Sequence, residues 1–145
     1  MKRKTKEQRI KRVTWIKVSH GEDLLKALTD YCLENNVQLG FISIIGALQR
    51  VNFNYYHQKE KKYYKNSIEE PVEIVSCAGN VSMKEGKPFI HAHLAVADRK
   101  GNVFGGHLEE GTIVFAAECV LFELEGDLME RKFDKTTGLF LWDFS

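Results

Sequence analysis

The segments that decide the fold are Phe89-Ile-His-Ala-His-Leu-Ala-Val-Ala97 and Val103-Phe-Gly-Gly-His-Leu108, joined by Asp98-Arg-Lys-Gly-Asn102. Both flanking segments are mainly apolar, with β-branched and aromatic residues, which predicts two strands. The polar connection, with a glycine near its end, predicts an antiparallel hairpin with a loop over residues 99–101. With Asp98 opposite Asn102, this register places His93 directly opposite His107.

Three histidines therefore converge on one face of the predicted hairpin. His91 and His93 lie two residues apart on a strand, so both side chains leave the same face. Opposed Cβ atoms in an antiparallel pair are ~4.5–5.5 Å apart and diagonal ones ~7–8 Å, which is close enough for His107 to join them. A two-residue loop would shift the register by one residue and turn His107 to the other face. The predicted cluster depends on that parity.

This cluster predicts a metal site. Three neutral imidazoles that leave a fourth position open are typical of a reactive zinc site, whereas a structural zinc site has four protein ligands. We expect His91, His93 and His107 to bind zinc or another divalent metal, which would acidify a bound water or polarise a carbonyl. The alternative is that the three histidines are hydrogen-bonded core residues or line an interface.

Two glycines precede His107 and allow two interpretations. Gly105 and Gly106 either mark a bulge or a close approach of two backbones within the sheet, or leave room for a ligand beside the metal. Glu109 and Glu110 follow His107 closely, and we expect both to be solvated.

Glu118 interrupts the apolar run over residues 113–122. A carboxylate in such a run needs a partner or a raised pKa, because an unpaired buried charge is costly. Glu118 is therefore a candidate to orient a ligand histidine or to act as a general base on metal-bound water. The alternative is an ion pair with a lysine or arginine at a subunit edge.

The rest of the chain predicts one helix and several strands. An apolar stripe with helical spacing runs from Leu24 to Cys32, and Ser19 and Glu22 have the spacing of a capping box. The other strands are expected at residues 13–18, 41–48, 51–55, 63–64, 71–78, 113–124, 129–133 and 139–142. The pattern predicts a mixed α/β (α+β) fold with mainly antiparallel pairing.

Composition and charge divide the chain into two parts. The 145 residues are 43% hydrophobic and 28% charged, which is typical of one globular domain. We expect a basic, flexible tail over residues 1–12 and a domain over residues 13–145. The folded part is net acidic and would repel phosphate, so only the tail is expected to bind DNA, weakly and without sequence preference. The basic residues of the tail are Lys2, Arg3, Lys4, Lys6, Arg9, Lys11 and Arg12.

The compartment is predicted from the cysteines and from the apolar runs. Cys32, Cys77 and Cys119 have apolar neighbours and form no Cys-x-x-Cys pair, which favours buried thiols in a reducing cytoplasm. No apolar run approaches the ~18–20 residues that a membrane span needs, so we expect no membrane partner. The basic N-terminus lacks the apolar core of a signal peptide.

The histidine motifs resemble those of a known family, the PPC domain (plants and prokaryotes conserved domain). The resemblance rests on Phe89–Leu94 and on Gly105-Gly-His-Leu108 with Gly111. The segments Gly21–Leu25, Ser43–Leu48 and Phe133-Asp134 with Thr137-Gly-Leu139 follow the family in the same order. It covers residues 13 to about 144 and implies a compact half-barrel sheet with one main helix packed on it, and a homotrimer.

The resemblance also bears on function. Some prokaryotic relatives contain a metal on histidines that match His91, His93 and His107, and the fold is similar to that of acetolactate decarboxylase, a zinc enzyme with three histidines. In plants the domain follows AT-hook motifs that bind DNA. This chain lacks the Arg-Gly-Arg-Pro core of such a hook, so the DNA-binding role transfers poorly.

Three functions follow as expectations. The first is a homotrimeric module for assembly and ligand binding that carries a three-histidine metal. The second is a zinc-dependent lyase or hydrolase that acts on a small carbonyl or carboxylate substrate, with Glu118 as base. The third is a DNA-associated protein that binds weakly through its basic tail.

Overall fold

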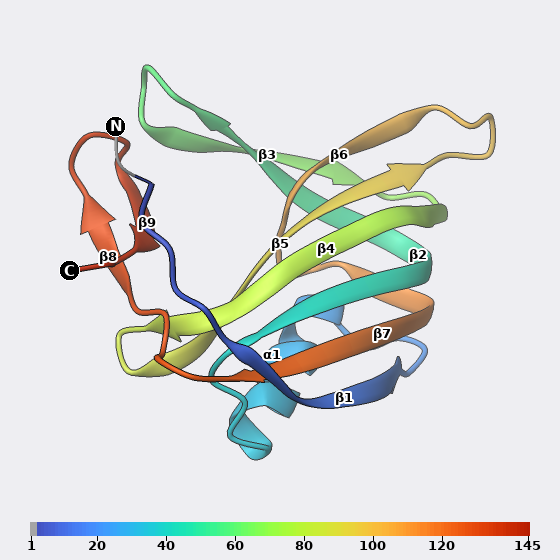
Figure 1. Cartoon of the computed structure of the whole chain (residues 1–145). Coiled ribbons are helices and arrows are strands. Elements are labelled where there is room, and N and C mark those ends of the chain that lie inside the picture. Colours follow the sequence, from blue (N-terminus) through green and yellow to red (C-terminus); the bar gives the residue numbers. More distant parts are fainter. Residues whose placement is uncertain (1–2) are drawn as a thin grey trace.

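The computed structural model describes residues 3–145, in which an antiparallel sheet curves around one helix (Figure 1). Seven strands form the main sheet in the order β1-β7-β2-β4-β5-β6, with β3 paired to β2, and β8 and β9 form a separate hairpin. In chain order the elements are β1 (Arg9–Val18), α1 (Leu24–Glu34), β2 (Gly40–His57), β3 (Lys62–Ile68), β4 (Val72–Lys84), β5 (Lys87–Ala97), β6 (Val103–Leu108), β7 (Ile113–Glu125), β8 (Arg131–Asp134) and β9 (Leu139–Trp142).

The curvature of the sheet comes from β2, one long strand where the sequence predicts two. Gly46 has a φ of 141°, and the register of β2 shifts beside it against both neighbouring strands. A Cβ at this position would lie 2.1 Å from the carbonyl oxygen of Ala116, so only glycine allows β7 to approach here. The first half of β2 pairs with β4 and β7, and the second half pairs with β3 and briefly with β6. The predicted mixed α/β, antiparallel-rich architecture is confirmed, and its curvature is that of a half-barrel.

The helix α1 covers one face of this sheet. Its buried residues Leu24, Leu28 and Cys32 join the core side of the sheet, as the apolar stripe predicts. The N-cap is Asp23, whose carboxylate accepts a hydrogen bond from the backbone N–H of Lys26 at 3.1 Å. The expected capping-box pair forms in part, because Glu22 accepts from the N–H of Ser19, but it closes the turn before the cap.

The β8–β9 hairpin lies outside the main sheet, beside the end of β4 (Figure 1). The backbone N–H of Met83 donates to the carbonyl of Met129 at 2.8 Å, which fixes the base of the hairpin to β4. The hydroxyl of Tyr56 donates to the carbonyl of Thr137 at 2.6 Å, which fixes its tip to β2. The hairpin therefore spans the space between two ends of the main sheet.

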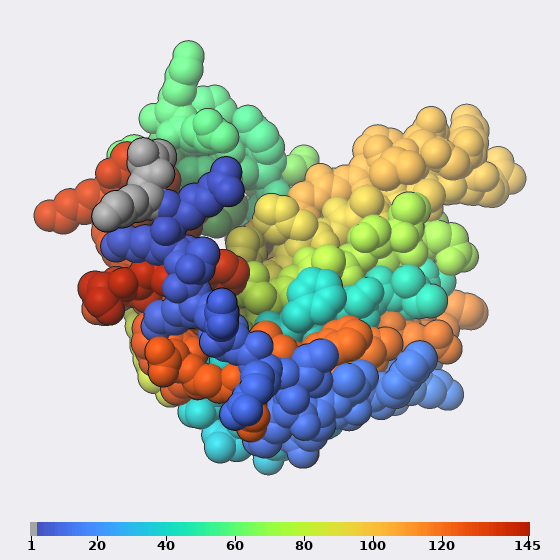
Figure 2. Space-filling view, viewed as in Figure 1, coloured from blue at the N-terminus to red at the C-terminus, as the bar shows by residue number. Residues whose placement is uncertain are grey.

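The N-terminal strand starts earlier than the sequence predicts. β1 begins at Arg9 and pairs with β7, so residues 9–12, expected within the basic tail, are part of the sheet. Glu123 of β7 is only 3% exposed, and the side chains of Lys11 and Arg12 form ion pairs with it. The expected flexibility of the preceding residues stays a prediction. Residues 3–8 lie beside the C-terminal segment (Figure 2), where the Lys6 ammonium is 6.0 Å from the ring centroid of Phe144.

The cysteines and the helix bear on two other expectations. Cys32, Cys77 and Cys119 are free and buried, as their apolar neighbours predict. Within residues 3–145, no helix has both the length and the apolar character that crossing a membrane requires.

Candidate metal centre

The β5–β6 hairpin has the register that its loop predicts. The N–H of Asp98 donates to the carbonyl of Asn102 at 3.0 Å, and Gly101 takes the left-handed conformation with a φ of 81°. His93 is therefore paired directly with His107. The parity on which the predicted cluster depends is confirmed.

The three histidines lie together on the sheet face opposite the core. One possible ligand atom from each of His91, His93 and His107 lies within 4.8 Å of the other two. The Nε2 atoms of His91 and His93 are 3.2 Å apart, and the three pairs of ring centroids are separated by 4.9–5.5 Å. Three imidazoles at this spacing fit one metal ion, with at least one coordination position left for a water or a ligand.

The electrostatics favour neutral imidazoles. Burial, followed by the neighbouring His107 and Arg131, lowers the pKa of His91 to about 4. Burial, followed by His93 and Arg131, lowers the pKa of His107 to about 4 as well. Both rings are therefore neutral at pH 7, which is the form that offers a lone pair to a metal.

A cavity of about 670 Å³ opens beside the cluster. Its walls come from β2 to β6, from one residue of α1 and from the β8–β9 hairpin, so the hairpin encloses a site that the main sheet alone would leave open. Aromatic and apolar side chains form much of the wall, which includes Tyr56, Tyr63, Phe89, Leu139 and Phe140.

Glu109 is a site residue that sequence reasoning missed, and the expectation that it is solvated is wrong. Its carboxylate is half-buried, accepts a hydrogen bond from Asn54 Nδ2 at 2.7 Å and lies 3.6 Å from Nε2 of His107. Burial raises its pKa, with the Asn54 hydrogen bond acting in the opposite direction. A signal was present, because Glu109 follows His107 by the same two-residue step that joins His91 to His93.

Arg131 is the second residue that sequence reasoning missed. It begins β8, is only 8% exposed and lines the cavity, with Nη2 3.4 Å from Nδ1 of His91. No local pattern indicates this position, because the hairpin reaches the histidines through tertiary packing alone.

The two predicted pocket glycines are placed by backbone contacts. A Cβ on Gly105 would lie 2.1 Å from the carbonyl oxygen of Leu94, and one on Gly106 would lie 2.5 Å from that of Asn54. Close backbone approach explains both residues, and Gly106 also lines the cavity.

The structure does not bring Glu118 together with the histidines. Its side chain is exposed on the outer face of β7, opposite Lys17 of β1 and Ile45 of β2. Alternation along β7 explains this position, because the flanking Ala117 and Cys119 take the buried face. The apolar run around Glu118 belongs to β7, whose inner face is buried in the core. The outer face of this strand would be covered only by another molecule.

The basic N-terminal residues are only partly free for phosphate. Lys11 and Arg12 pair with Glu123, and Arg9 pairs with Glu125 at 3.4 Å. Arg3, Lys4 and Lys6 precede the sheet and are exposed, and Lys2 lies outside the described residues.

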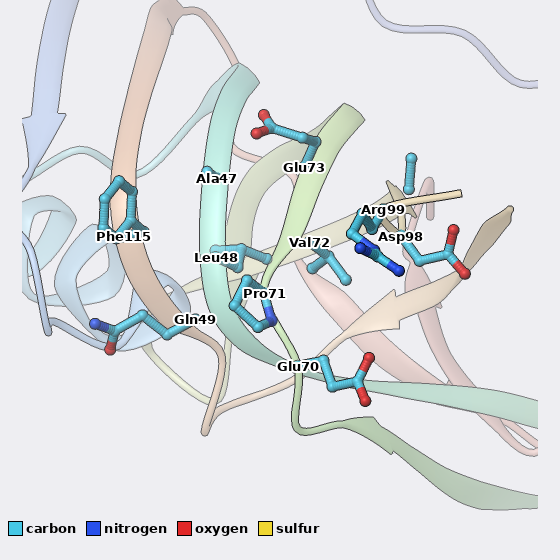
Figure 3. A pocket seen from close by; sticks show the side chains of 11 residues that line it. Ala47, Leu48, Gln49, Glu70, Pro71, Val72, Glu73, Asp98, Arg99 and Phe115 are labelled. Carbon is cyan, nitrogen blue, oxygen red and sulfur yellow. The ribbon is translucent and has the colours of Figure 1, made fainter. Parts of the chain in front are cut away.

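A second cavity, of about 550 Å³, lies at another part of the sheet (Figure 3). It is lined by residues of β2, β4 and β7, including Leu48, Val72 and Phe115, and by Asp98 and Arg99 of the hairpin loop. None of the three clustered histidines lines it.

Comparison with known proteins places this geometry in context. The sequence profile of the Plants and Prokaryotes Conserved (PCC) domain matches residues 5–125. The crystal structure of a metal-containing protein from Archaeoglobus fulgidus is 39% identical, with a TM-score of 0.91 over 98% of this chain and 99% of that chain. A plant- and prokaryote-conserved (PPC) protein from Pyrococcus horikoshii is 37% identical, with a TM-score of 0.91 over 96% of both chains.

Two further likenesses are more limited. A candidate DNA-binding protein from Bacteroides thetaiotaomicron has a TM-score of 0.86 over 94% of this chain and 97% of that chain, but its 24% identity shows the fold alone. The Bifunctional protein GlmU of Synechococcus sp. (strain JA-3-3Ab) is 31% identical over 129 residues, which are 88% of this chain. The chain spans about a fifth of the length of that curated relative.

Proposed function

The chain belongs to the Plants and Prokaryotes Conserved domain family, and we propose that it is a homotrimeric module that binds a small ligand at a three-histidine zinc site. The observation that carries the metal site is the convergence of His91, His93 and His107 within 4.8 Å beside a cavity. The similar protein from Archaeoglobus fulgidus, described as metal-containing, supports the same assignment. The three buried thiols support the cytoplasm as the compartment.

Metal analysis tests this site. Purified protein dialysed against zinc is expected to hold one ion per chain by elemental analysis, and His93→Ala is expected to lose it. The loss in affinity should exceed the roughly 10–100-fold cost of removing an outer partner of a metal ligand. His57→Ala is the matched control, because His57 lies on the β2–β3 hairpin outside the cluster. Equal metal content in all three proteins would show that the three histidines do not form the metal site.

The outer face of the sheet supports assembly into a trimer. Trp15 of β1 is 79% exposed, and the rings of Phe41 and Phe122 pack 6.0 Å apart on the same face. Apolar groups exposed together on a sheet face are typical of an interface. Glu118 lies on this face opposite Lys17, which fits a role at a subunit edge.

Sedimentation tests the assembly. Wild-type protein is expected to sediment as a trimer, and Trp15→Lys is expected to dissociate it. Leu33→Lys, on the exposed side of α1, is the control and should leave the trimer intact. A monomer for the wild-type chain would overturn the proposed trimer.

A zinc-dependent lyase or hydrolase is the second candidate, and the half-buried Glu109 beside His107 favours it. A carboxylate at this position is placed to serve as a general base, because it lies 3.6 Å from Nε2 of His107 at the edge of the cavity. Turnover of a small carbonyl or carboxylate compound should vanish with a chelator and with Glu109→Gln. Glu118→Gln is the matched control, because it removes a carboxylate from β7, away from the histidines, and should leave this turnover unchanged.

A DNA-associated role is the third candidate, and Arg3, Lys4 and Lys6 are the exposed cations that support it. Deletion of residues 1–8 should abolish any DNA affinity, which should also fall steeply with salt. Binding that survives the deletion and high salt would contradict a role for the tail.

A further inference from the structure

Arg131 is a buried cation whose hydrogen-bond partners are all neutral. Its Nε donates to Ser82 Oγ at 2.8 Å, Nη1 to the carbonyl of Phe140 at 3.0 Å and Nη2 to Asn80 Oδ1 at 2.9 Å. Throughout residues 3–145, no carboxylate lies within ion-pair distance of this guanidinium. A buried charge without a counter-charge is costly, so this side chain favours an anion supplied from outside the chain.

A second cation lies on the same wall of the cavity. Lys84 lines it, with its ammonium 4.1 Å from the ring centroid of Phe140 and 5.0 Å from that of Phe89. The guanidinium of Arg131 lies 5.4 Å from the centroid of Phe89. Two cations are therefore held over one shared aromatic ring, that of Phe89, at one end of the cavity.

The ring of His91 connects this end of the cavity to the metal cluster. Its Nε2 faces His93 at 3.2 Å and its Nδ1 faces Arg131 Nη2 at 3.4 Å. A neutral imidazole that binds a metal through Nε2 carries its proton on Nδ1. Nδ1–H and the guanidinium would then both be donors, and an anionic oxygen is the acceptor that would satisfy both.

We propose that the cavity binds a small organic carboxylate, with the carboxylate on Arg131 and Lys84 and the other end of the molecule toward the three histidines. The aromatic and aliphatic wall suits a carbon chain and not a bare inorganic ion. A guanidinium forms paired hydrogen bonds with a carboxylate and with a phosphate, so the test separates the two. The inference rests on the proposed metal site, because that site supplies the second anchor.

Calorimetric titration of the zinc-loaded full-length chain tests the anion site. Succinate, acetate and inorganic phosphate are the probes, and zinc content is measured first on the same sample. Succinate is expected to bind more tightly than acetate or phosphate. Arg131→Met is expected to weaken succinate binding by about 10–100-fold, which is the range for loss of a hydrogen bond to a charged group. Arg99→Met, at the exposed hairpin loop, removes the same charge and should change nothing.

Further variants keep the test decisive if Arg131→Met does not fold. Arg131→Lys retains the charge and should bind succinate more tightly than Arg131→Met, and Lys84→Met should weaken binding in a chain with all contacts of Arg131 intact. Succinate should also raise the thermal unfolding midpoint of the wild-type chain.

The outcomes separate the two claims. A chain that takes up one zinc but binds no succinate, or binds phosphate more tightly, overturns the carboxylate site and leaves the metal site standing. A chain that takes up no zinc overturns the metal site. Succinate binding to that metal-free chain that depends on Arg131 would then still support the anion site, and its absence would overturn it.

Discussion

At the scale of single residues, the backbone approach at Gly105 and Gly106 yields a prediction about stability. Alanine at either position would place a methyl group 2.1–2.5 Å from a carbonyl oxygen of β5 or β2. We expect Gly106→Ala to lower the free energy of unfolding by about 3 kcal/mol, the upper part of the usual cost of overpacking. Urea unfolding measures this change.

The control for this prediction is Gly101→Ala in the hairpin loop. A Cβ there meets nothing within 4 Å, and only the φ of 81° opposes it. That conformational strain should cost about 1–2 kcal/mol. If Gly106→Ala were as stable as the wild-type chain, the close packing of β6 against β2 would be wrong.

The buried thiols give a prediction about pH. Burial raises the pKa of Cys32, Cys77 and Cys119 from about 9.0 to about 12. Between pH 9 and pH 12 the unfolded chain loses protons that the folded chain keeps, so stability should be full below pH 9 and fall as the pH rises. Urea unfolding at pH 8 and pH 10.5 measures this loss.

Thiol chemistry checks the same residues at pH 8. A thiol-reactive disulfide reagent is expected to leave the native chain unmodified and to label three cysteines in urea, because the thiolate is the reactive form. Rapid labelling of one cysteine in the native chain would contradict the burial of that side chain.

The histidine cluster can be predicted from the sequence for a definite physical reason. The side-chain alternation of a strand and the length of one loop determine that His93 faces His107, and both can be read from local sequence. The sequence predicts a solvated Glu109, because the burial of this residue depends on Asn54, which lies on a distant strand. Arg131 has no local signal at all, since its neighbours come from β4, β5 and β9.

At the scale of elements, the N-cap of α1 predicts a measurable contribution to stability. Asp23 accepts hydrogen bonds from the backbone N–H of Lys26 and from that of Gly111, so it joins the helix to the turn before β7. Asp23→Ala should lower the free energy of unfolding by about 1–2 kcal/mol, and Asp23→Asn by less, because asparagine also caps helices. Chemical unfolding monitored by circular dichroism measures both.

Asp30→Ala provides the matched control on the same helix. The carboxylate of Asp30 pairs with the Lys26 ammonium at 2.6 Å on the exposed surface. Because both side chains are exposed to solvent, this pair should contribute much less than the helix cap. Equal losses for the alanine variants of Asp23 and Asp30 would contradict the capping role.

The elements also show where pattern reasoning stops. Apolar periodicity identified α1 and the separate strands, because one buried face imposes a repeat on the sequence. It divides β2 into two strands at residues 49–50, because the polar pair Gln49-Arg50 interrupts the apolar pattern without ending the strand. The same pattern makes Glu118 a candidate to lie near the metal. An apolar run does not indicate whether the chain itself or another molecule covers each face of a strand.

At the scale of the whole molecule, Glu123 determines how firmly the N-terminal strand joins the domain. Glu123→Gln should lower the free energy of unfolding by about 1–3 kcal/mol, because it removes charged hydrogen bonds from a buried acceptor. Amide hydrogen exchange in β1 should also become faster. Glu125→Gln is the control, since its partner Arg9 is 86% exposed and such pairs contribute about 0–1 kcal/mol. Unchanged exchange in β1 would mean that Glu123 does not hold the strand.

The position of the β8–β9 hairpin has a consequence for how ligand selectivity can change among related proteins. It lies beyond residue 125, where the match to the domain profile ends, and it forms its own two-stranded sheet. The candidate metal ligands belong to the main sheet, and part of the opposing wall belongs to this second sheet. Substitutions in the hairpin can therefore change which ligand the cavity binds while the three histidines stay the same. Exchanging the hairpin between homologues should change ligand selectivity in the same way.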